Sequence, residues 1–233
     1  MEAPVILNIL LVLLLSYLAG SIPTSIIIAR AVRGIDIRQH GSENAGATNV
    51  YRVLGLKWAI IVALADVGKG AFAALVLSGL PVGAPPAFIS PVLYQLLAGG
   101  AAVAGHIWTL FGGFKGGKGV ATAVGAFLGI APAAVGICLL VWLILVFTVR
   151  IMSVASLVAA TLLPVAVWVL GMGAAEKAPP ELIGFTVLLA LLIFYTHRSN
   201  IGRLLRGEER VLGRPGSARP EQGGDEMEGG GEG

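Results

Sequence analysis

GVATAVGAFLGIAPAAVGICLLVWLILVFTV, residues 119–149, contains no charged side chain. An α-helix rises about 1.5 Å per residue and needs roughly 20 apolar residues to cross a bilayer. The run is therefore too long for one ordinary crossing and short for two. Pro132, with Gly129 and Gly136 near it, would allow the chain to fold back here as a helical hairpin.

The rest of the chain has the same apolar character. Its 233 residues are 56% hydrophobic and 12% charged, with a mean hydropathy of +0.88, whereas soluble domains are about a quarter charged. Further apolar runs occupy residues 4–29, 57–80, 91–111, 153–171 and 182–196. This pattern predicts an all-α integral membrane protein. The single cysteine, Cys138, excludes a disulfide framework and a cysteine-based metal site.

The first apolar run does not resemble a signal peptide. Residues 4–29 are too many for the apolar core of such a peptide, and Glu2 precedes them where positive charge would be expected. Basic residues come only afterwards, from Arg30 onward. We therefore expect this run to be retained as the first helix.

The basic residues indicate the topology, because lysine and arginine accumulate on cytoplasmic loops. If residues 119–149 cross twice, seven helices result and nearly all basic residues lie on one side. This group comprises Arg30, Arg33, Arg38, Arg52, Lys57, Lys115, Lys118, Arg150 and the arginines from Arg198 to Arg219. Only Lys177 lies outside, whereas a single crossing would move Arg150 and the arginine-rich tail outside. The sequence predicts about seven transmembrane helices, with the N-terminus outside and the C-terminus in the cytoplasm.

The chain is expected to form one membrane domain and a tail. Residues 1–210 contain every apolar run, whereas residues 211–233 are rich in Gly, Glu and Arg and end in EGGGEG. Such a tail cannot bury enough apolar surface to offset the entropy lost on ordering. We predict that residues 211–233 form a disordered cytoplasmic tail.

The first polar island on the predicted inner face is GSENAGATNVYR, residues 41–52. It contributes glycine N–H groups, the hydroxyls of Ser42 and Thr48, the amide of Asn49 and the guanidinium of Arg52. These are the groups that bind phosphate oxygens. Taken alone, the island is equally well interpreted as a solvated turn.

The second island, GGFKGGKGVAT at residues 112–122, nearly matches the nucleotide-binding pattern G-x-x-x-x-G-K-[ST]. The match fails at Gly119, where a hydroxyl should follow Lys118, and a membrane helix precedes it in place of a strand. An ATPase is therefore not expected. The loop still has the features of an anion-binding site: flexible glycines, the charges of Lys115 and Lys118, and the N-terminus of the following helix. We therefore favour anion binding over the alternative, a basic loop that only fixes the membrane topology.

The third island is HRSNIGRLLRGEE, residues 197–209, where His197 and Asn200 share one helical face. The alternative is an amphipathic exit lying on anionic lipid headgroups. Ser153 and Ser156 have the same spacing after Arg150, although such hydroxyls often bond to their own helical turn.

Asp66, Lys69 and His106 stand out within the apolar runs. Asp66 and Lys69 can neutralise one another at their i, i+3 spacing, which favours support of a site over chemistry. His106 is interpreted as a packing residue or a supporting hydrogen-bond donor.

Five motifs then occur together in a fixed order: Gly41-Ser42-x-Asn44-x-Gly46-Ala47-Thr48-Asn49, Asp66-x-x-Lys69-Gly70, Gly105-His106, the residues 114–122 FKGGKGVAT, and His197-Arg198-x-Asn200-Ile201. Over about residues 5–210 the chain strongly resembles the bacterial acyl-phosphate:glycerol-3-phosphate acyltransferase (PlsY) family. The resemblance implies a multi-pass enzyme of the bacterial inner membrane with its active site at the cytoplasmic face. Its reaction would make lysophosphatidic acid from glycerol 3-phosphate and acyl phosphate. Glu43 departs from the glycine that the family commonly has there.

The reaction implied by this resemblance suggests a role for each candidate residue. An activated acyl phosphate requires orientation and charge neutralisation more than a strong nucleophile. We assign phosphate capture to Ser42, Arg52, Lys118 and Asn200. The backbone amides of Gly116 and Gly117, with Thr48, would hold the second phosphate or the developing oxyanion. Further substrate-binding candidates are Asn49, Lys115, Gly119, Ser153 and Ser156.

The base and the partners follow from the same chemistry. Either His197 or a phosphate oxygen of the substrate could accept the proton of the glycerol hydroxyl, and the acyl chain would lie between helices in the bilayer. Membrane lipids are the expected surroundings. No cofactor, metal, nucleic acid or obligate protein partner is expected.

One absence bears on the acyl donor. Acyltransferases that use thioester donors resemble one another in a His-x-x-x-x-Asp box, but the fifth residues after the three histidines here are Ala45, Phe111 and Gly202.

Two other classes of protein stay open at this point, a transporter of phosphorylated solutes and a lipid-binding scaffold. A transporter should present anion-binding groups on both faces, and the predicted outer loops, 81–90 and 172–181, contain one lysine and two glutamates.

Overall fold

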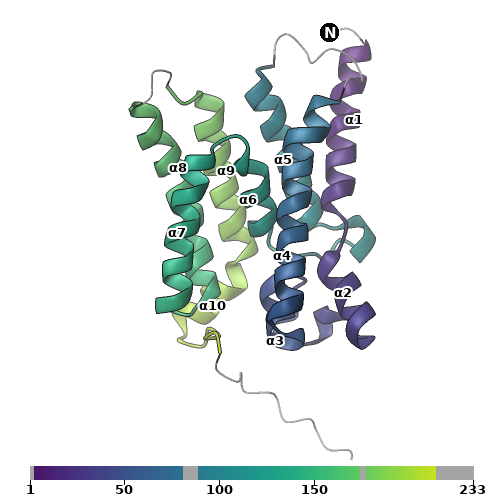
Figure 1. Cartoon of the computed structure of the whole chain (residues 1–233), viewed down its shortest axis with the longest axis vertical. Helices are drawn as coiled ribbons and strands as arrows, with labels where there is room; N and C mark the ends of the chain where they lie inside the picture. Colours follow the sequence, from purple (N-terminus) through teal and green to yellow (C-terminus); the bar gives the residue numbers. More distant parts are fainter. Residues whose placement is uncertain (1–2, 81–88, 174–176, 214–233) are drawn as a thin grey trace, which may run out of the picture.

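The computed structural model describes residues 3–80, 89–173 and 177–213. Within these ranges the chain forms helices and no strands, arranged as a bundle of upright helices with shorter ones at one end (Figure 1). The helices are α1 (Ala3–Gly20), α2 (Thr24–Arg33), α3 (Ala47–Leu54), α4 (Leu56–Ala71), α5 (Pro91–Ile107), α6 (Val120–Leu128), α7 (Pro132–Thr148), α8 (Met152–Met172), α9 (Pro180–Thr196) and α10 (Arg198–Leu205). Short 3-10 turns lie at Ile37–Gln39, Leu77–Gly79 and Leu110–Gly112, and a π-helical turn at Phe72–Val76 continues α4.

The predicted break in residues 119–149 is confirmed. Helix α6 ends at Leu128 and α7 begins at Pro132, which occupies the first turn, where its missing N–H costs nothing. Figure 1 shows the chain turning over between these helices. The apolar run is therefore two helices joined by a tight connection, as the hairpin interpretation requires.

The predicted number of seven spans is only partly matched. Among the described residues, three helical stretches are long and apolar enough to cross a membrane: Val5–Arg33, Leu56–Gly79 and Met152–Met172. The pair α9 and α10, bent by 62°, gives a fourth if it counts as one span, and α7 is a shorter apolar helix. Seven spans and the orientation of the termini stay predictions, and residues 214–233 of the predicted tail lie outside the described residues.

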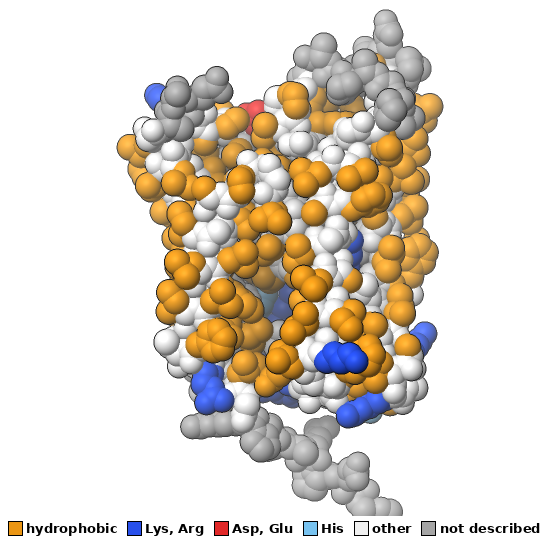
Figure 2. Space-filling model, viewed as in Figure 1, with side chains coloured by type: hydrophobic (Ala, Val, Ile, Leu, Met, Phe, Trp, Pro, Cys, Tyr) orange, Lys and Arg blue, Asp and Glu red, His pale blue; other side chains and the backbone are white. Residues whose placement is uncertain are grey.

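The surface has the character of a membrane protein. Large apolar side chains such as Leu64 and Phe147 are exposed, whereas polar side chains such as Asn49, Asp66 and Thr186 are buried. Figure 2 shows apolar side chains covering the flank of the bundle, with lysines and arginines gathered mainly towards one end. This arrangement suits a lipid surround, with a basic face at one end of the bundle.

Close contact between α4 and α6 brings the two halves of the chain together. A Cβ on Gly70 would lie 2.0 Å from the carbonyl oxygen of Thr122, and one on Gly125 would lie 1.9 Å from that of Val67. Only glycine permits this approach, the usual way in which membrane helices pack closely. Since α6 follows directly on the glycine–lysine island, this contact fixes that island against α4.

Candidate active site

The glycine–lysine island forms a loop held against the end of α5. The N–H of Gly116 donates to the carbonyl oxygen of Ile107 at 3.0 Å, and that of Gly117 donates to His106 O at 3.0 Å. The structure thus engages the two amides that the sequence analysis assigned to phosphate or oxyanion, because they face the unpaired carbonyls at the end of a helix. Gly119 follows with a left-handed φ of 85° and leads into α6.

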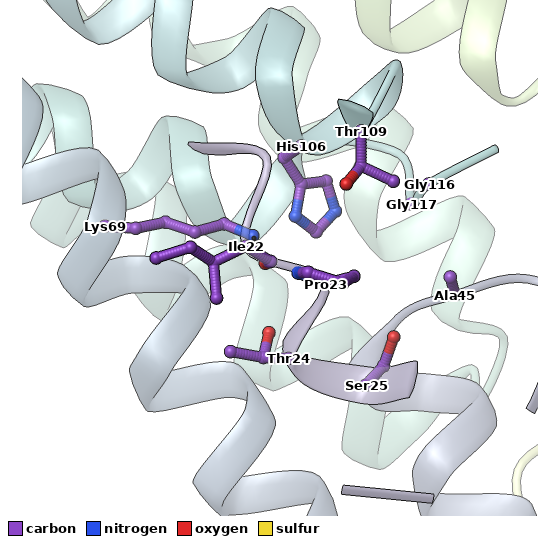
Figure 3. A pocket seen from close by; sticks show the side chains of 10 residues that line it. All are labelled: Ile22, Pro23, Thr24, Ser25, Ala45, Lys69, His106, Thr109, Gly116 and Gly117. Carbon is purple, nitrogen blue, oxygen red and sulfur yellow. Dashed lines mark hydrogen bonds between the residues drawn. The ribbon is translucent and has the colours of Figure 1, made fainter. Parts of the chain in front are cut away.

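A buried polar cluster, which includes His106, packs against this loop. Asp66 Oδ1 accepts from Thr24 Oγ1 at 2.6 Å and lies 2.9 Å from Lys69 Nζ and 3.6 Å from His106 Nδ1. Lys69 Nζ also donates to Ile22 O at 3.2 Å, at the break between α1 and α2. Figure 3 shows Lys69 and His106 extending towards this break, in a small pocket that Gly116 and Gly117 also line. The cluster thus joins α2, α4 and α5 beneath the loop, which agrees with the supporting role predicted for Asp66 and Lys69.

The predicted residues Lys118, Asn200 and Ser153 come together around a carboxylate. Lys118 Nζ donates to Asn200 Oδ1. Asn200 Nδ2 donates to Glu209 Oε1 at 2.6 Å, and Ser153 Oγ donates to the same oxygen at 2.9 Å. Arg203 Nε donates to Glu209 Oε2 at 2.7 Å. These five residues are called the Lys118 cluster below.

Glu209 is a residue of this cluster that the sequence analysis did not single out. Its side chain is only 5% exposed, although it follows α10 in a short connecting segment. A signal was present, since the acidic pair Glu208–Glu209 ends an island that is otherwise basic. Of the pair, Glu208 is exposed and bonded to Arg206.

Positive charge exceeds negative charge around the cluster. Burial, together with the neighbouring Arg203 and Arg52, lowers the pKa of Lys118 to about 8, and the carboxylate of Glu209 opposes this shift. Burial and the charges of Arg210 and Arg203 also lower the pKa of Arg52. Burial alone would raise the pKa of Glu209, but the bonds from Asn200, Ser153 and Arg203 lower it. Arg203 is ion-paired with Glu209, and the charge of the same carboxylate acts on Lys118 and Arg52. Positive charge is therefore in local excess, which favours binding of an anion.

His197 lies beside this cluster at the junction of α9 and α10. Its ring is buried, and Nδ1 lies 2.8 Å from the carbonyl oxygen of Ile193. A carbonyl oxygen can only accept, so Nδ1 carries the proton and Nε2 is the acceptor nitrogen of the neutral ring. The preceding Thr196 donates to Lys118 O at 3.2 Å, which ties this junction to the glycine–lysine loop.

Other predicted residues are placed elsewhere. Asn49 is fully buried, where its Nδ2 donates to Ile37 O and His40 O, both at 2.9 Å, and its Oδ1 accepts from Ser42 N at 2.7 Å. Its amide thus shapes the first island and sets the position of Ser42. Ser156 accepts from Trp142 Nε1 at 3.4 Å. Lys115 is exposed, and Thr48 lies in the first turn of α3.

The turn geometry at Glu43 is unusual, as its departure from glycine suggested. Its φ is 61°, in the left-handed region where a side chain is disfavoured. The substitution is therefore accommodated with backbone strain and without loss of the turn.

The flank of the bundle is hollowed near the middle of the face shown in Figure 2. Basic and histidine side chains are visible within this hollow, and apolar side chains border it. The hollow thus has charged side chains inside and apolar side chains at its edge, on the flank of the bundle. This arrangement suits a substrate with a polar head and a lipid chain. Among the described residues, no group of three or more His, Cys, Asp or Glu side chains could hold a metal ion.

Comparisons with known proteins agree with this chemistry. The profile of the glycerol-3-phosphate acyltransferase family matches residues 10–207. A glycerol-3-phosphate acyltransferase of Chlorobium phaeobacteroides (strain BS1) is 44% identical over 87% of this chain and 95% of its own length. A glycerol-3-phosphate acyltransferase of Chlorobaculum tepidum is 41% identical over 88% of this chain and 97% of its own length.

Two solved structures share the fold. They are crystal structures of PlsY (YgiH), an integral membrane glycerol 3-phosphate acyltransferase, in its glycerol 3-phosphate and lysophosphatidic acid forms. Both are 36% identical and cover 88% of this chain, with 96% and 95% of their own chains covered and TM-scores of 0.77 and 0.74.

Proposed function

This chain belongs to the glycerol-3-phosphate acyltransferase family, and on that premise we propose that it takes its acyl group from acyl phosphate and captures substrate phosphate at the Lys118 cluster. It is a membrane enzyme that acylates glycerol 3-phosphate to lysophosphatidic acid in phospholipid synthesis. The observation that carries the proposal is the excess of positive charge around Glu209, which is ion-paired with Arg203 and whose charge also acts on Lys118 and Arg52.

Phosphate binding is assigned to this excess. A phosphate oxygen accepts strong, charge-assisted bonds from lysine and arginine. Lys118 and Arg52 neutralise the phosphate, and Asn200 and Ser153 orient the lysine and the carboxylate beside it. Ser42, Thr48 and Lys115 extend the binding surface from the first and second islands. The first turn of α6, whose N–H groups lack partners within the helix, adds partial positive charge.

The proposed reaction is a direct transfer. The glycerol hydroxyl oxygen attacks the carbonyl carbon of the acyl phosphate and forms the new ester bond. The bond between that carbon and the phosphate oxygen then breaks, and its electron pair leaves with inorganic phosphate. Lys118 stabilises the charge that develops on the leaving phosphate, so that the protein acts mainly by positioning and electrostatics.

The hydroxyl proton has two available acceptors, His197 Nε2 and a phosphate oxygen of the substrate. The bond between His197 Nδ1 and Ile193 O presents Nε2 as an acceptor, which supports the first. Substitution of His197 by Gln distinguishes them. Loss of about 10²–10⁴-fold in kcat is expected if His197 is the base, and a small effect if the phosphate oxygen is.

The charge pattern supports the proposed orientation in the membrane. We place seven spans in the bacterial inner membrane, with the Lys118 cluster at the cytoplasmic face and the acyl chain in the lateral hollow. The gathering of basic side chains towards one end of the bundle supports this orientation (Figure 2).

Donor competition tests the proposal. Purified enzyme should form lysophosphatidic acid from acyl phosphate and glycerol 3-phosphate without added metal or nucleotide. Acyl-CoA and acyl carrier protein thioesters should be poor donors, because no histidine lies in a His-x-x-x-x-Asp box. Comparable turnover with a thioester would overturn the donor assignment.

A further inference from the structure

Glu209 joins the segment around α10 to the start of α8, which lies 56 residues earlier in the sequence. Its carboxylate accepts from Ser153 at the start of α8, from Asn200 in α10 and from Arg203 one turn later. A carboxylate with this many donors is fixed in one orientation, and hydrogen bonds to a charged group are the stronger ones. The side chain of Glu209 is 5% exposed and that of its partner Arg203 is 31% exposed, so the carboxylate is shielded from solvent at the edge of the bundle.

The orientation of the Asn200 amide follows from Glu209. A carboxylate can only accept, so the Asn200 group that faces it must be the Nδ2 amine. The opposite side of the amide, Oδ1, is then presented to Lys118 Nζ. Without an acceptor at position 209, the amide could turn over and direct its donors at the ammonium group.

The charge of Glu209 acts on Lys118 as well. The charged groups around Lys118 Nζ are Arg203 on α10, Arg52 on α3 and Glu209 itself, and His197 lies next to them. Burial and both arginines favour the neutral amine, whereas Glu209 favours the charged ammonium.

We infer that Glu209 is a positioning residue for acyl transfer: through Asn200 it sets the direction of Lys118 Nζ, and by its charge it keeps that group an ammonium ion in front of the substrate phosphate. Glu209 need not touch either substrate. The inference rests on the proposed role of Lys118. It extends the site to a residue beyond the membrane helices, in the segment after α10.

The pH dependence of Lys118 gives the decisive readout. A lysine that must be charged loses activity as pH rises through its pKa, which is about 8 here. Glu209→Gln removes the one group that raises this pKa, so the alkaline fall in kcat/KM should move to lower pH by about one pH unit. Arg203→Gln removes a group that lowers it, so the fall should move to higher pH. A general loss of folding would not shift the two variants in opposite directions.

The experiment uses the full chain in detergent. The variants Glu209→Gln, Arg203→Gln and the matched control Glu208→Gln are compared with wild type by kcat/KM from pH 6 to 10. The rate at which an amine reagent modifies Lys118 is followed over the same range by mass spectrometry. We expect Glu209→Gln to lose about tenfold in kcat/KM at pH 8, and Glu208→Gln to match wild type, because that side chain is exposed.

The outcomes separate this inference from the function on which it rests. If Lys118→Ala keeps wild-type activity, the proposed role of Lys118 fails, while the modification profile still tests whether Glu209 sets its charge. An unchanged Lys118 profile in Glu209→Gln would overturn the inference. So would tighter binding of glycerol 3-phosphate by that variant, because Glu209 would then compete with phosphate for the same donors.

Discussion

His106 and Gly117 are in contact with no room for a side chain between them. A Cβ built on Gly117 would lie 2.1 Å from His106 Nε2 and 2.8 Å from Ala45 O. The other ring nitrogen, Nδ1, faces Asp66 at 3.6 Å, so the imidazole is held from behind. Gly117 precedes Lys118 directly, and the buried cluster around Asp66 therefore determines where the glycine–lysine loop lies.

Gly117→Ala should remove most of the activity. The added methyl group must displace either the His106 ring or the loop, and overpacking of this kind costs about 1–3 kcal/mol of stability. A displacement of about 1 Å at a positioned group can cost roughly 10²-fold in rate. Initial rates and the Tm in detergent measure the two effects.

Gly68→Ala is the matched control for that substitution. Gly68 lies in α4, and a Cβ there meets nothing within 4 Å. Alanine should leave the rate unchanged and stabilise the helix by about 0.5–1 kcal/mol. Wild-type kinetics in Gly117→Ala would show that the contact with His106 does not set the loop position.

Lys118→Ala should lower activity by about ten- to a hundredfold, because one charge-assisted phosphate contact is worth roughly 1.5–3 kcal/mol. The protein should stay folded in detergent. Lys57→Ala is the control: Lys57 is exposed and lies over the Trp58 ring at 5.1 Å. Equal kinetics for the two variants would show that Lys118 binds no phosphate and that the glycine–lysine loop only fixes the membrane topology.

Breaking the buried pair of Asp66 and Lys69 should destabilise the protein more than removing both charges. Their charged atoms lie 2.9 Å apart, and their side chains are 3% and 8% exposed. Asp66→Asn or Lys69→Met alone leaves an unpaired buried charge, which costs about 3–5 kcal/mol. The double variant should recover part of that loss in free energy of unfolding.

Activity of the double variant separates support from chemistry. If Asp66 and Lys69 only hold α2, α4 and α5 beneath the loop, the double variant should retain more activity than either single variant. A double variant that is stable but inactive would assign the pair a direct role in the reaction.

The helices could be predicted from the sequence because lipid imposes length and composition on each crossing. Pro132 marked the break between α6 and α7 for the same local reason. Lys118 and Asn200 were identified by residue type, since cations and amides suit phosphate. These properties belong to single residues or short runs.

What could not be predicted depends on tertiary contacts. Glu209 accepts from Ser153, 56 residues earlier, and nothing near either residue indicates the pairing. The sequence shows that Gly116 and Gly117 have N–H groups, but not that these groups meet the carbonyl oxygens of Ile107 and His106. Asn49 looked like a ligand for the same reason, because its type suits phosphate whether its amide is engaged or not.

The membrane topology is tested by cysteine labelling. Helix α8 is one of the candidate spans, so its two ends should lie on opposite sides of the membrane. Arg150 precedes this helix, and basic segments stay inside, which places Gly173 at the outer end. Single cysteines at Val149, Gly173 and Glu208, in a chain with Cys138 replaced by alanine, report on both ends of α8 and on the segment after α10.

We expect an impermeant maleimide to label Gly173→Cys in intact cells and to label Val149→Cys and Glu208→Cys only after permeabilisation. All three positions suit a probe: Val149 and Glu208 are exposed, and a Cβ on Gly173 meets nothing within 4 Å. Activity of each variant, measured first, shows that the cysteine leaves the fold intact. Labelling of Gly173→Cys and Glu208→Cys from the same side would refute the seven-span arrangement. Labelling of Val149→Cys from outside would show instead that residues 119–149 cross the membrane once, which would place α7 and α8 in the opposite orientation.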